Sequence, residues 1–182
     1  MARPRTRRIV HEAVLAIVAE RPMAALTMEG IAARASVSKQ TLYRTWPSTS
    51  AILFDALLAR SLDESGAVVV PDSGDLAADL RLLIAGMVGE LTDPVHGALL
   101  RAVTADILGD EALAAQHREL LLRPQLAAIA DRLARAGVTD AEDAAELLVG
   151  PVLHRWLLRT RRFDEAWVAA HVGRVLRAVA LA

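Results

Sequence analysis

The only lysine and the only tyrosine of this chain, Lys39 and Tyr43, lie four residues apart in a short polar segment. Positions four apart on a helix share a face, so a helix here would place Lys39 beside Tyr43 and Gln40 beside Arg44. Lysine and arginine pair with guanine, glutamine pairs with adenine, and the methyl group of Thr41 can contact thymine. These residue types at this spacing therefore indicate a helix that binds in a DNA groove.

The flanking sequence would position this helix. An apolar helix, Thr27 to Ala35, precedes it across a tight turn, and Leu42 and Trp46 would hold it from behind. Thr27 and Ser38 are good N-caps, because a hydroxyl there can accept a hydrogen bond from an exposed N–H at the helix start. Two short helices in this order are typical of a helix-turn-helix DNA reader.

Phosphate contacts are expected around the same helices. We expect Thr27 and Thr49 at phosphates, although a hydroxyl that only caps a helix needs no DNA contact. The hydroxyl of Tyr43 suits a phosphate, and four arginines at the amino terminus form an arm for a minor groove or the backbone, unless they stay solvated. A solvated polar helix face is the alternative for the whole set. The predicted DNA-binding residues are Thr27, Ser38, Lys39, Gln40, Thr41, Tyr43, Arg44, Thr49, Arg3, Arg5, Arg7 and Arg8.

Charge is distributed unevenly along the 182 residues. Residues 1–50 contain eight basic and three acidic side chains, a net charge of +5, whereas the whole chain carries −1, which leaves −6 for residues 51–182. A basic head on an acidic body is typical of a DNA-binding module joined to one that does not bind DNA, with chance clustering of arginines as the alternative. We therefore predict a DNA-binding domain over residues 1–50 and a second domain over residues 51–182.

The composition predicts an all-α protein. Apolar residues make up 54% of the chain but aromatic residues only 3%, so alanine, leucine and valine must form the core. Helix formers dominate, and the one strand-like run, Ala67 to Val70, is too short to support a sheet. We expect about nine helices, in a three-helix DNA-binding head and a helical body.

Caps and breakers predict the helix boundaries. The first helix should run from Thr6 to Glu20, and a fourth should begin at Ser48 or Thr49. A weakly structured linker, Ser65 to Gly74, separates these from five longer helices. The longer helices are expected at Asp75–Leu91, His96–Leu108, Glu111–Ala136 with a kink or split at Pro124, Asp140–Thr160 and Asp164–Leu181.

Two observations concern the cellular compartment. The chain has no cysteine, which excludes disulfides and thiolate metal sites and fits a reducing cytoplasm. The basic amino terminus could begin a secretion signal, but His11, Glu12 and Glu20 interrupt the apolar run at helical spacing and favour an amphipathic helix. No apolar run approaches the roughly 18 residues that cross a bilayer, so we expect a soluble, cytoplasmic protein.

The last two predicted helices carry continuous apolar stripes. Two such helices at the end of a chain can pack on their own body, or meet their copies across a two-fold axis as a four-helix bundle. The composition leaves both arrangements open. The candidate dimer-interface residues are Ala144, Leu147, Leu148, Val152, Trp167, His171, Val172, Val175, Leu176 and Val179.

The segment from Leu26 to Ser48 resembles the TetR family of transcriptional repressors. The matching features, in order, are the threonine that opens the second helix, an Ile-Ala pair, a Val-Ser turn, the Leu-Tyr pair of the third helix and an aromatic-Pro-Ser closure. The resemblance covers residues of about 9 to 58 closely and implies a DNA-binding regulator. The acidic remainder resembles the ligand-binding and dimerisation region of the family only in helix count, length and the stretch from Leu147 to Leu153.

Two positions depart from the family pattern. The family usually places a lysine after the Pro-Ser pair, where it meets a phosphate; this chain has Thr49, whose hydroxyl or backbone N–H can still bind phosphate. The family also tends to have glycine in the turn, where this chain has Ser36. Either Ser36 adopts a left-handed backbone at modest strain, or the turn has a different shape.

The resemblance implies a homodimeric repressor that binds a pseudo-palindromic operator in double-stranded DNA and is released by a small, largely apolar effector. The effector would occupy an apolar cavity with a few polar anchors. Bending is expected at Gly150-Pro151 and at the linker. The candidate pocket residues are Met87, Leu91, His96, Leu100, Arg101, Val103, Thr104, Asp106, His117, His154 and Trp156.

The same residues bear on other classes of function. An enzyme is disfavoured because the chain has no Gly-rich phosphate loop, no Gly-x-Ser-x-Gly elbow and no cysteine nucleophile. The five histidines are scattered without zinc-ligand spacing, so neither a metal site nor a cofactor is predicted. A constitutive DNA-binding protein would share the same head and lack an effector cavity. Activation instead of repression also stays open.

Overall fold

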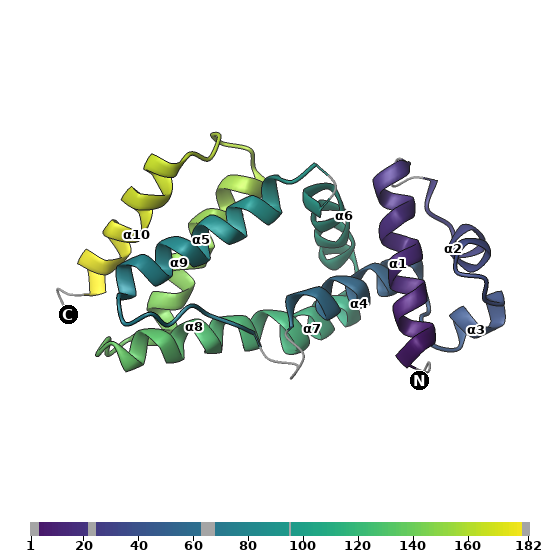
Figure 1. The fold of residues 1–182 in the computed structure, drawn as a ribbon, viewed down its shortest axis with the longest axis horizontal. Helices are drawn as coiled ribbons and strands as arrows, with labels where there is room; N and C mark the ends of the chain where they lie inside the picture. The colour runs from purple at the N-terminus through teal and green to yellow at the C-terminus, as the bar shows by residue number, and fades with distance from the viewer. Residues whose placement is uncertain (1–3, 22–24, 63–67, 95, 180–182) are drawn as a thin grey trace. The chain divides into compact units, whose positions relative to one another are not determined.

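The computed structural model describes residues 4–21, 25–62, 68–94 and 96–179, and every regular element in these ranges is a helix (Figure 1). The predicted all-α class is confirmed. Val68, Val69 and Val70 form no strand, because no neighbouring segment offers a partner, and Ala67 lies outside the described residues. The expected helix end at Leu181 also lies outside them.

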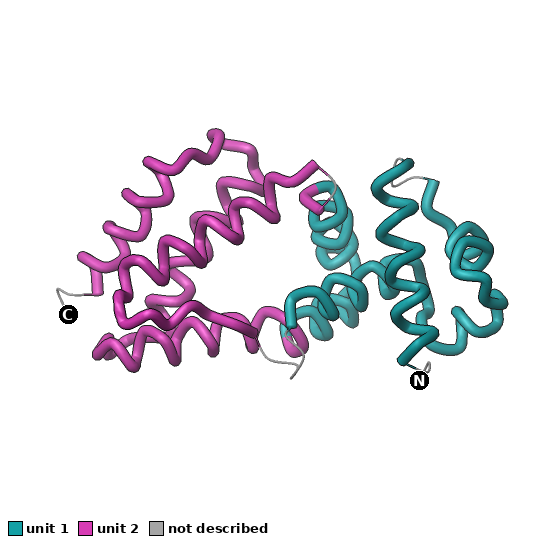
Figure 2. The backbone as a smooth tube through the Cα atoms, in the orientation of Figure 1, with its two compact units in different colours: residues 1–62, 98–118 teal, residues 63–97, 119–182 magenta. Residues whose placement is uncertain are grey.

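The chain divides into two compact units (Figure 2). Unit 1 consists of residues 1–62 and 98–118, and unit 2 consists of residues 63–97 and 119–182. The second segment of unit 1 therefore comes from the middle of the chain, which the sequence had assigned to the body.

Unit 1 contains the short helices that were predicted to read DNA. Its helices are α1 (Pro4–Glu20), α2 (Met28–Arg34), α3 (Lys39–Tyr43), α4 (Thr49–Ser61), α6 (His96–Gly109, from Ala98 onward) and α7 (Glu111–His117). The hydroxyls of Thr27, Ser38 and Ser48 each accept a hydrogen bond from a backbone N–H three residues later, at 3.0–3.1 Å. The two predicted N-caps, Thr27 and Ser38, are thus confirmed, Ser48 is a third, and the three fix where α2, α3 and α4 begin.

The core of unit 1 lies behind the short helices. α1 packs against α2 and α4, and α2 packs against α3. Leu42 is fully buried and Trp46 is 4% exposed, so both hold α3 from behind as predicted. Val14 and Ile52, from α1 and α4, complete the same core.

Unit 2 is a bundle of longer helices. They are α5 (Leu76–Thr92), α8 (Arg123–Arg135), α9 (Ala141–Leu157) and α10 (Glu165–Val179). α9 packs against α5, α8 and α10, and its buried stripe forms the centre of the unit. α9 runs through Gly150-Pro151 with Pro151 inside the helix, and the bending expected there stays a prediction. Pro151 is also exposed, so neighbouring backbone carbonyls can be solvated.

The predicted split near Pro124 takes the form of a π-helical segment. α7 continues through Arg118–Leu122, which is π-helical, directly into α8. Pro124 sits in the first turn of α8, where its missing N–H and its ring would disturb a regular helix four residues back. Counting α7 to α8 as one continuous helix, the described residues form nine helices, as expected.

Candidate nucleic-acid interface

The outward face of α3 consists of polar side chains. Lys39, Gln40, Tyr43 and Arg44 are exposed, with Tyr43 at 54%, whereas Thr41 is half-buried. Arg44 follows α3 directly as its C-cap and keeps a helical backbone. The structure therefore brings the predicted base-contacting side chains onto one accessible surface.

The hydroxyls of this surface are engaged in the helix ends. Ser38 Oγ accepts a hydrogen bond from the Thr41 backbone N–H and lies 2.8 Å from Thr41 Oγ1. Thr27 caps α2, while Thr49 is the first residue of α4 and the capping role belongs to Ser48. A first-turn N–H such as that of Thr49 has no partner within its own helix and can bind a phosphate.

The turn between α2 and α3 is left-handed at Ser36. Its φ of +53° places it in a region that glycine adopts freely and that costs other residues roughly 1 kcal/mol. Of the two alternatives for this position, the strained one is therefore present. The turn keeps the shape that glycine would give it, and serine bears the cost.

The amino-terminal arginines do not form an extended arm over the described residues. α1 begins at Pro4, a favourable first helical position, so Arg5, Arg7 and Arg8 are helical. Arg7 Nε donates to Asp55 at 2.8 Å, and Arg8 lies 3.7 Å from Glu12. Arg7 is therefore held inside unit 1, and Arg3 lies outside the described residues.

Asp55 is a hub that sequence analysis did not find. Its carboxylate accepts hydrogen bonds from the Arg7 guanidinium, from His11 Nε2 at 2.9 Å and from Trp46 Nε1 at 2.9 Å. Burial would raise the pKa of Asp55, but the hydrogen bonds from His11, Arg7 and Trp46 outweigh it and hold the pKa well below its usual range. The hub joins α1 and α4 to the segment that follows α3. The one feature of the sequence that could have indicated this role is that Asp55 is an acidic residue inside the apolar run of α4.

Two ion pairs on the same unit were also missed. Lys39 Nζ lies 2.7 Å from Glu29 Oε1, and Arg34 Nη1 donates to Glu20 at 2.6 Å. Each pair joins side chains from different helices, so no spacing rule within one helix could identify it. The pairing of Lys39 matters most, because Lys39 was predicted to contact DNA.

The predicted pocket residues fall in both units. Met87, Leu91, His96, His154 and Trp156 belong to unit 2, and Leu100, Arg101, Val103, Thr104, Asp106 and His117 belong to unit 1. Leu91, Val103 and Trp156 are buried apolar side chains, as a pocket wall requires. Asp106 and His154 are exposed instead.

The polar members of that set have local partners. Asp106 accepts a hydrogen bond from Ser50, and the Thr104 hydroxyl donates to the Leu100 carbonyl at 2.7 Å. His96 Nδ1 lies 3.1 Å from Asp93. His117 packs against Phe54 with ring centroids 5.8 Å apart, and burial lowers the pKa of His117. His117 is therefore the member of the set that is both titratable and placed against an apolar side chain.

The predicted interface residues are mostly inside unit 2. Ala144, Leu148, Val152, His171, Val172 and Val175 are buried by their own chain, and His171 Nε2 donates to the Leu148 carbonyl at 2.8 Å. Trp167, Leu176 and Val179 are half-buried, and Trp167 stacks on His171. Leu147, at 45%, is the exposed member. The stripes expected to meet a partner thus pack chiefly on the protomer's own core.

The described ranges contain neither a metal-binding cluster nor a membrane-spanning helix. Within them, no group of three histidine, aspartate or glutamate side chains could hold a metal ion. No helix in the same ranges is both long and apolar enough to cross a membrane.

Comparison with known proteins accounts for both parts of the chain. Residues 11–56 match the family described as bacterial regulatory proteins, tetR family, and residues 70–175 match a tetracyclin repressor-like C-terminal domain. The chain is 27% identical to the uncharacterized HTH-type transcriptional regulator YdeS of Bacillus subtilis, over 87% of this chain and 83% of YdeS. It is 29% identical to the HTH-type transcriptional regulator AqdR of Rhodococcus erythropolis, over 80% of this chain and 69% of AqdR.

The fold is also similar to that of a solved regulator structure. The TetR family transcription regulator SCO0332 superposes with a TM-score of 0.80 and 30% identity, covering 96% of this chain and 98% of SCO0332. Each of these relatives is described as a regulator of transcription. With the capped helix-turn-helix of unit 1 and family matches along both parts of the sequence, the chain belongs to the TetR family of DNA-binding transcriptional regulators.

Proposed function

We propose that this regulator acts in the cytoplasm as a homodimeric, ligand-released repressor of a pseudo-palindromic operator, with no cofactor and no catalytic reaction. Two copies of α3 would enter successive major grooves, about 34–36 Å or a multiple of that distance apart. The observation that carries this proposal is the polar, exposed face of α3 above the buried Leu42 and Trp46.

The side chains of this face have distinct proposed tasks. Lys39 and Arg44 suit guanine, and Gln40 suits adenine. The Thr41 hydroxyl is engaged by Ser38, which leaves its methyl group for a thymine contact. The exposed hydroxyl of Tyr43, the exposed Arg5 and the helix starts at Thr27 and Thr49 would bind phosphates, which fix the orientation of the protein without reading sequence.

The proposed dimer uses the outer face of α9. This face exposes three leucines, Leu147, Leu153 and Leu157, and the C-cap residue Leu158 adds a fourth, at 38–60% exposure. Large apolar side chains that gather on one exposed helix face are typical of an interaction surface. A two-fold axis would let the face meet its own copy, and the exposed alanines of α10, Ala166, Ala169 and Ala170, permit close approach of a second helix.

The proposed effector is a small, largely apolar molecule. The buried Leu91 and Trp156 and the half-buried Met87, all in unit 2, support an apolar environment for it. An effector that prefers a conformation with wrongly spaced α3 helices by a few kcal/mol would release the operator.

The decisive experiment is selection of DNA by the purified protein from a randomised duplex library. The expected product is a pseudo-palindrome bound by two protomers, with dissociation constants measured by fluorescence anisotropy and mass by light scattering. Recovery of no preferred sequence, or of one protomer per duplex, would contradict the proposal. Thermal-shift screening against hydrophobic drugs, acyl-CoA thioesters and lactones then tests the effector, since a binding ligand raises the melting temperature.

A further inference from the structure

The lysine of α3 forms an ion pair within the protein. Glu29 is the second residue of α2 and Lys39 the first residue of α3, and their charged atoms lie 2.7 Å apart. Both side chains are 56% exposed, so the pair stands at the surface that faces solvent. The side-chain bond from Lys39 lowers the pKa of Glu29, which is therefore ionised at neutral pH.

Such a pair is weak and can be broken by a competing ligand. Exposed ion pairs change an equilibrium constant by less than about tenfold. On random DNA, Lys39 could gain one phosphate contact at most, and Glu29 competes for it with a carboxylate already at 2.7 Å. On a guanine at the right position, Lys39 gains directed bonds that discriminate by roughly ten- to a hundredfold. Transfer of Lys39 from Glu29 to DNA therefore brings no gain on random DNA and a net gain on a correctly placed guanine.

We propose that Glu29 is a specificity-determining residue that withholds Lys39 from the phosphates of random DNA and yields it to a correctly placed guanine. It raises the ratio of operator binding to non-specific binding by weakening the latter. The proposal rests on the assignment of Lys39 to the DNA face made above. Arg44, the other basic side chain of this face, has no ion pair among those of the described residues, so no carboxylate there competes with DNA for it.

The test compares Glu29→Gln, Lys39→Gln and the double variant with the wild type. Fluorescence anisotropy gives affinities for a 30-bp duplex of random sequence and for the duplex selected from the library, from about 50 to 300 mM NaCl. We expect Glu29→Gln to raise affinity for the random duplex about three- to tenfold, with a salt slope steeper by about one. Affinity for the selected duplex should change less, so the specificity ratio falls.

The double variant and a matched control separate this mechanism from a general charge effect. In the Lys39→Gln background, Glu29→Gln should give no further gain, because the lysine it restrains is absent. Glu20→Gln removes another exposed, ion-paired carboxylate from unit 1, whose partner Arg34 is not assigned to DNA, and should leave the ratio unchanged.

The opposite results would overturn the proposal. It fails if Glu29→Gln leaves random-duplex affinity unchanged, if the gain persists without Lys39, or if Glu20→Gln gives an equal gain. If Lys39→Gln binds the selected duplex as tightly as the wild type does, the DNA-face assignment of Lys39 fails and this inference fails with it. If Lys39→Gln weakens binding while Glu29→Gln has no effect, only the role of Glu29 is lost.

Discussion

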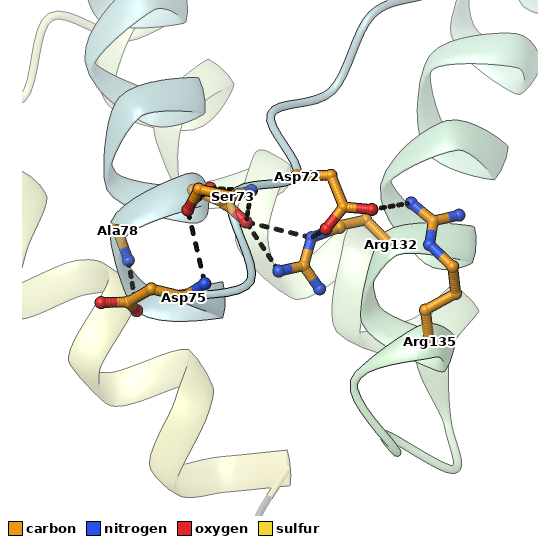
Figure 3. Close-up of polar contacts among 7 residues, drawn as sticks. Asp72, Ser73, Asp75, Ala78, Arg132 and Arg135 are labelled. Carbon is orange, nitrogen blue, oxygen red and sulfur yellow. Dashed lines mark hydrogen bonds and ion pairs between the residues drawn. The ribbon is translucent and has the colours of Figure 1, made fainter.

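Arg132 donates two hydrogen bonds to Asp79 in the interior of unit 2, at 2.6 Å from Nη2 and 3.1 Å from Nε. The two residues are 3% and 2% exposed, and they join α8 to α5. Ser73 also donates to Asp79, chiefly through its hydroxyl, and together with Arg132 it lowers the pKa of Asp79. Figure 3 shows Asp72 bridging Arg132 and Arg135, so the loop before α5 is tied to α8.

Breaking this buried pair should destabilise unit 2. Arg132→Met leaves the Asp79 carboxylate buried without its cation, and we expect the melting temperature to fall by roughly 10 °C. Replacing both members, as Asp79→Leu with Arg132→Met, should recover much of the loss, because no charge then remains buried. Thermal unfolding followed by circular dichroism measures both. Arg135→Met, at the exposed end of the same network, should change the melting temperature by less than about 2 °C.

The Asp55 hub should make the stability of unit 1 depend on pH. Because the pKa of Asp55 is lowered on folding, its ionised form stabilises the fold above the unfolded pKa of about 4, and this contribution is lost as the pH falls through the folded pKa. Asp55→Asn should cost about 1–3 kcal/mol at pH 7. The difference in the free energy of unfolding between this variant and the wild type should persist at pH 5 and become smaller at pH 3, as measured by urea unfolding. A difference that is the same at pH 3 would show that the charge of Asp55 is irrelevant.

Relief of strain at Ser36 should stabilise the protein. Ser36→Gly removes the left-handed serine at φ +53°, and we expect a gain of about 0.5–1 kcal/mol in the free energy of unfolding, part of which the flexibility of glycine offsets. Arg159, at φ +52° in unit 2, offers a second site where glycine should stabilise for the same reason. Ala33→Gly, inside α2, should instead lose about 1 kcal/mol. A lower free energy of unfolding for Ser36→Gly would mean that the serine side chain makes a contact that stabilises the fold by more than the backbone strain destabilises it.

Arg44 should contribute to sequence reading. Arg44→Ala should weaken binding to the selected duplex by about 1–3 kcal/mol and relax the preference at one base pair. Repeating the library selection with the variant identifies that base pair. Equal weakening on all sequences would show that Arg44 contacts the backbone. Arg60→Ala, which removes an arginine from the far end of α4, serves as the control and should bind DNA as the wild type does.

The leucine face of α9 should hold the dimer together. Leu147→Glu with Leu157→Glu places charges on the exposed side of α9 and should give monomers in light scattering, with weak operator binding. Leu82→Glu changes a leucine of α5 that is 64% exposed, and should leave the dimer intact. Dimers that survive the double substitution would place the interface elsewhere. Both variants avoid the buried stripe, so unit 2 should stay folded.

Local chemistry made much of unit 1 predictable. The capping hydroxyls of Thr27, Ser38 and Ser48 act within three residues, so the sequence contains the whole interaction. The same holds for the exposed face of α3 above Leu42, because helical periodicity alone separates the two faces. In unit 2, the disturbance at Pro124 likewise follows from the missing N–H of that residue.

Only the tertiary structure decided which groups distant in sequence meet. Asp55 collects partners from α1 that lie 44 and 48 residues away, and Asp79 meets Arg132 across 53 residues, distances over which no spacing rule operates. α9 carries leucines on several sides, so periodicity could not tell that Leu148 faces its own core while Leu147 faces outward. The sequence by itself determined the helices and the polar exposed face of α3, because those depend on neighbours along the chain. Packing between helices decided the ion pairs and the free apolar face, because burial depends on what the rest of the chain covers.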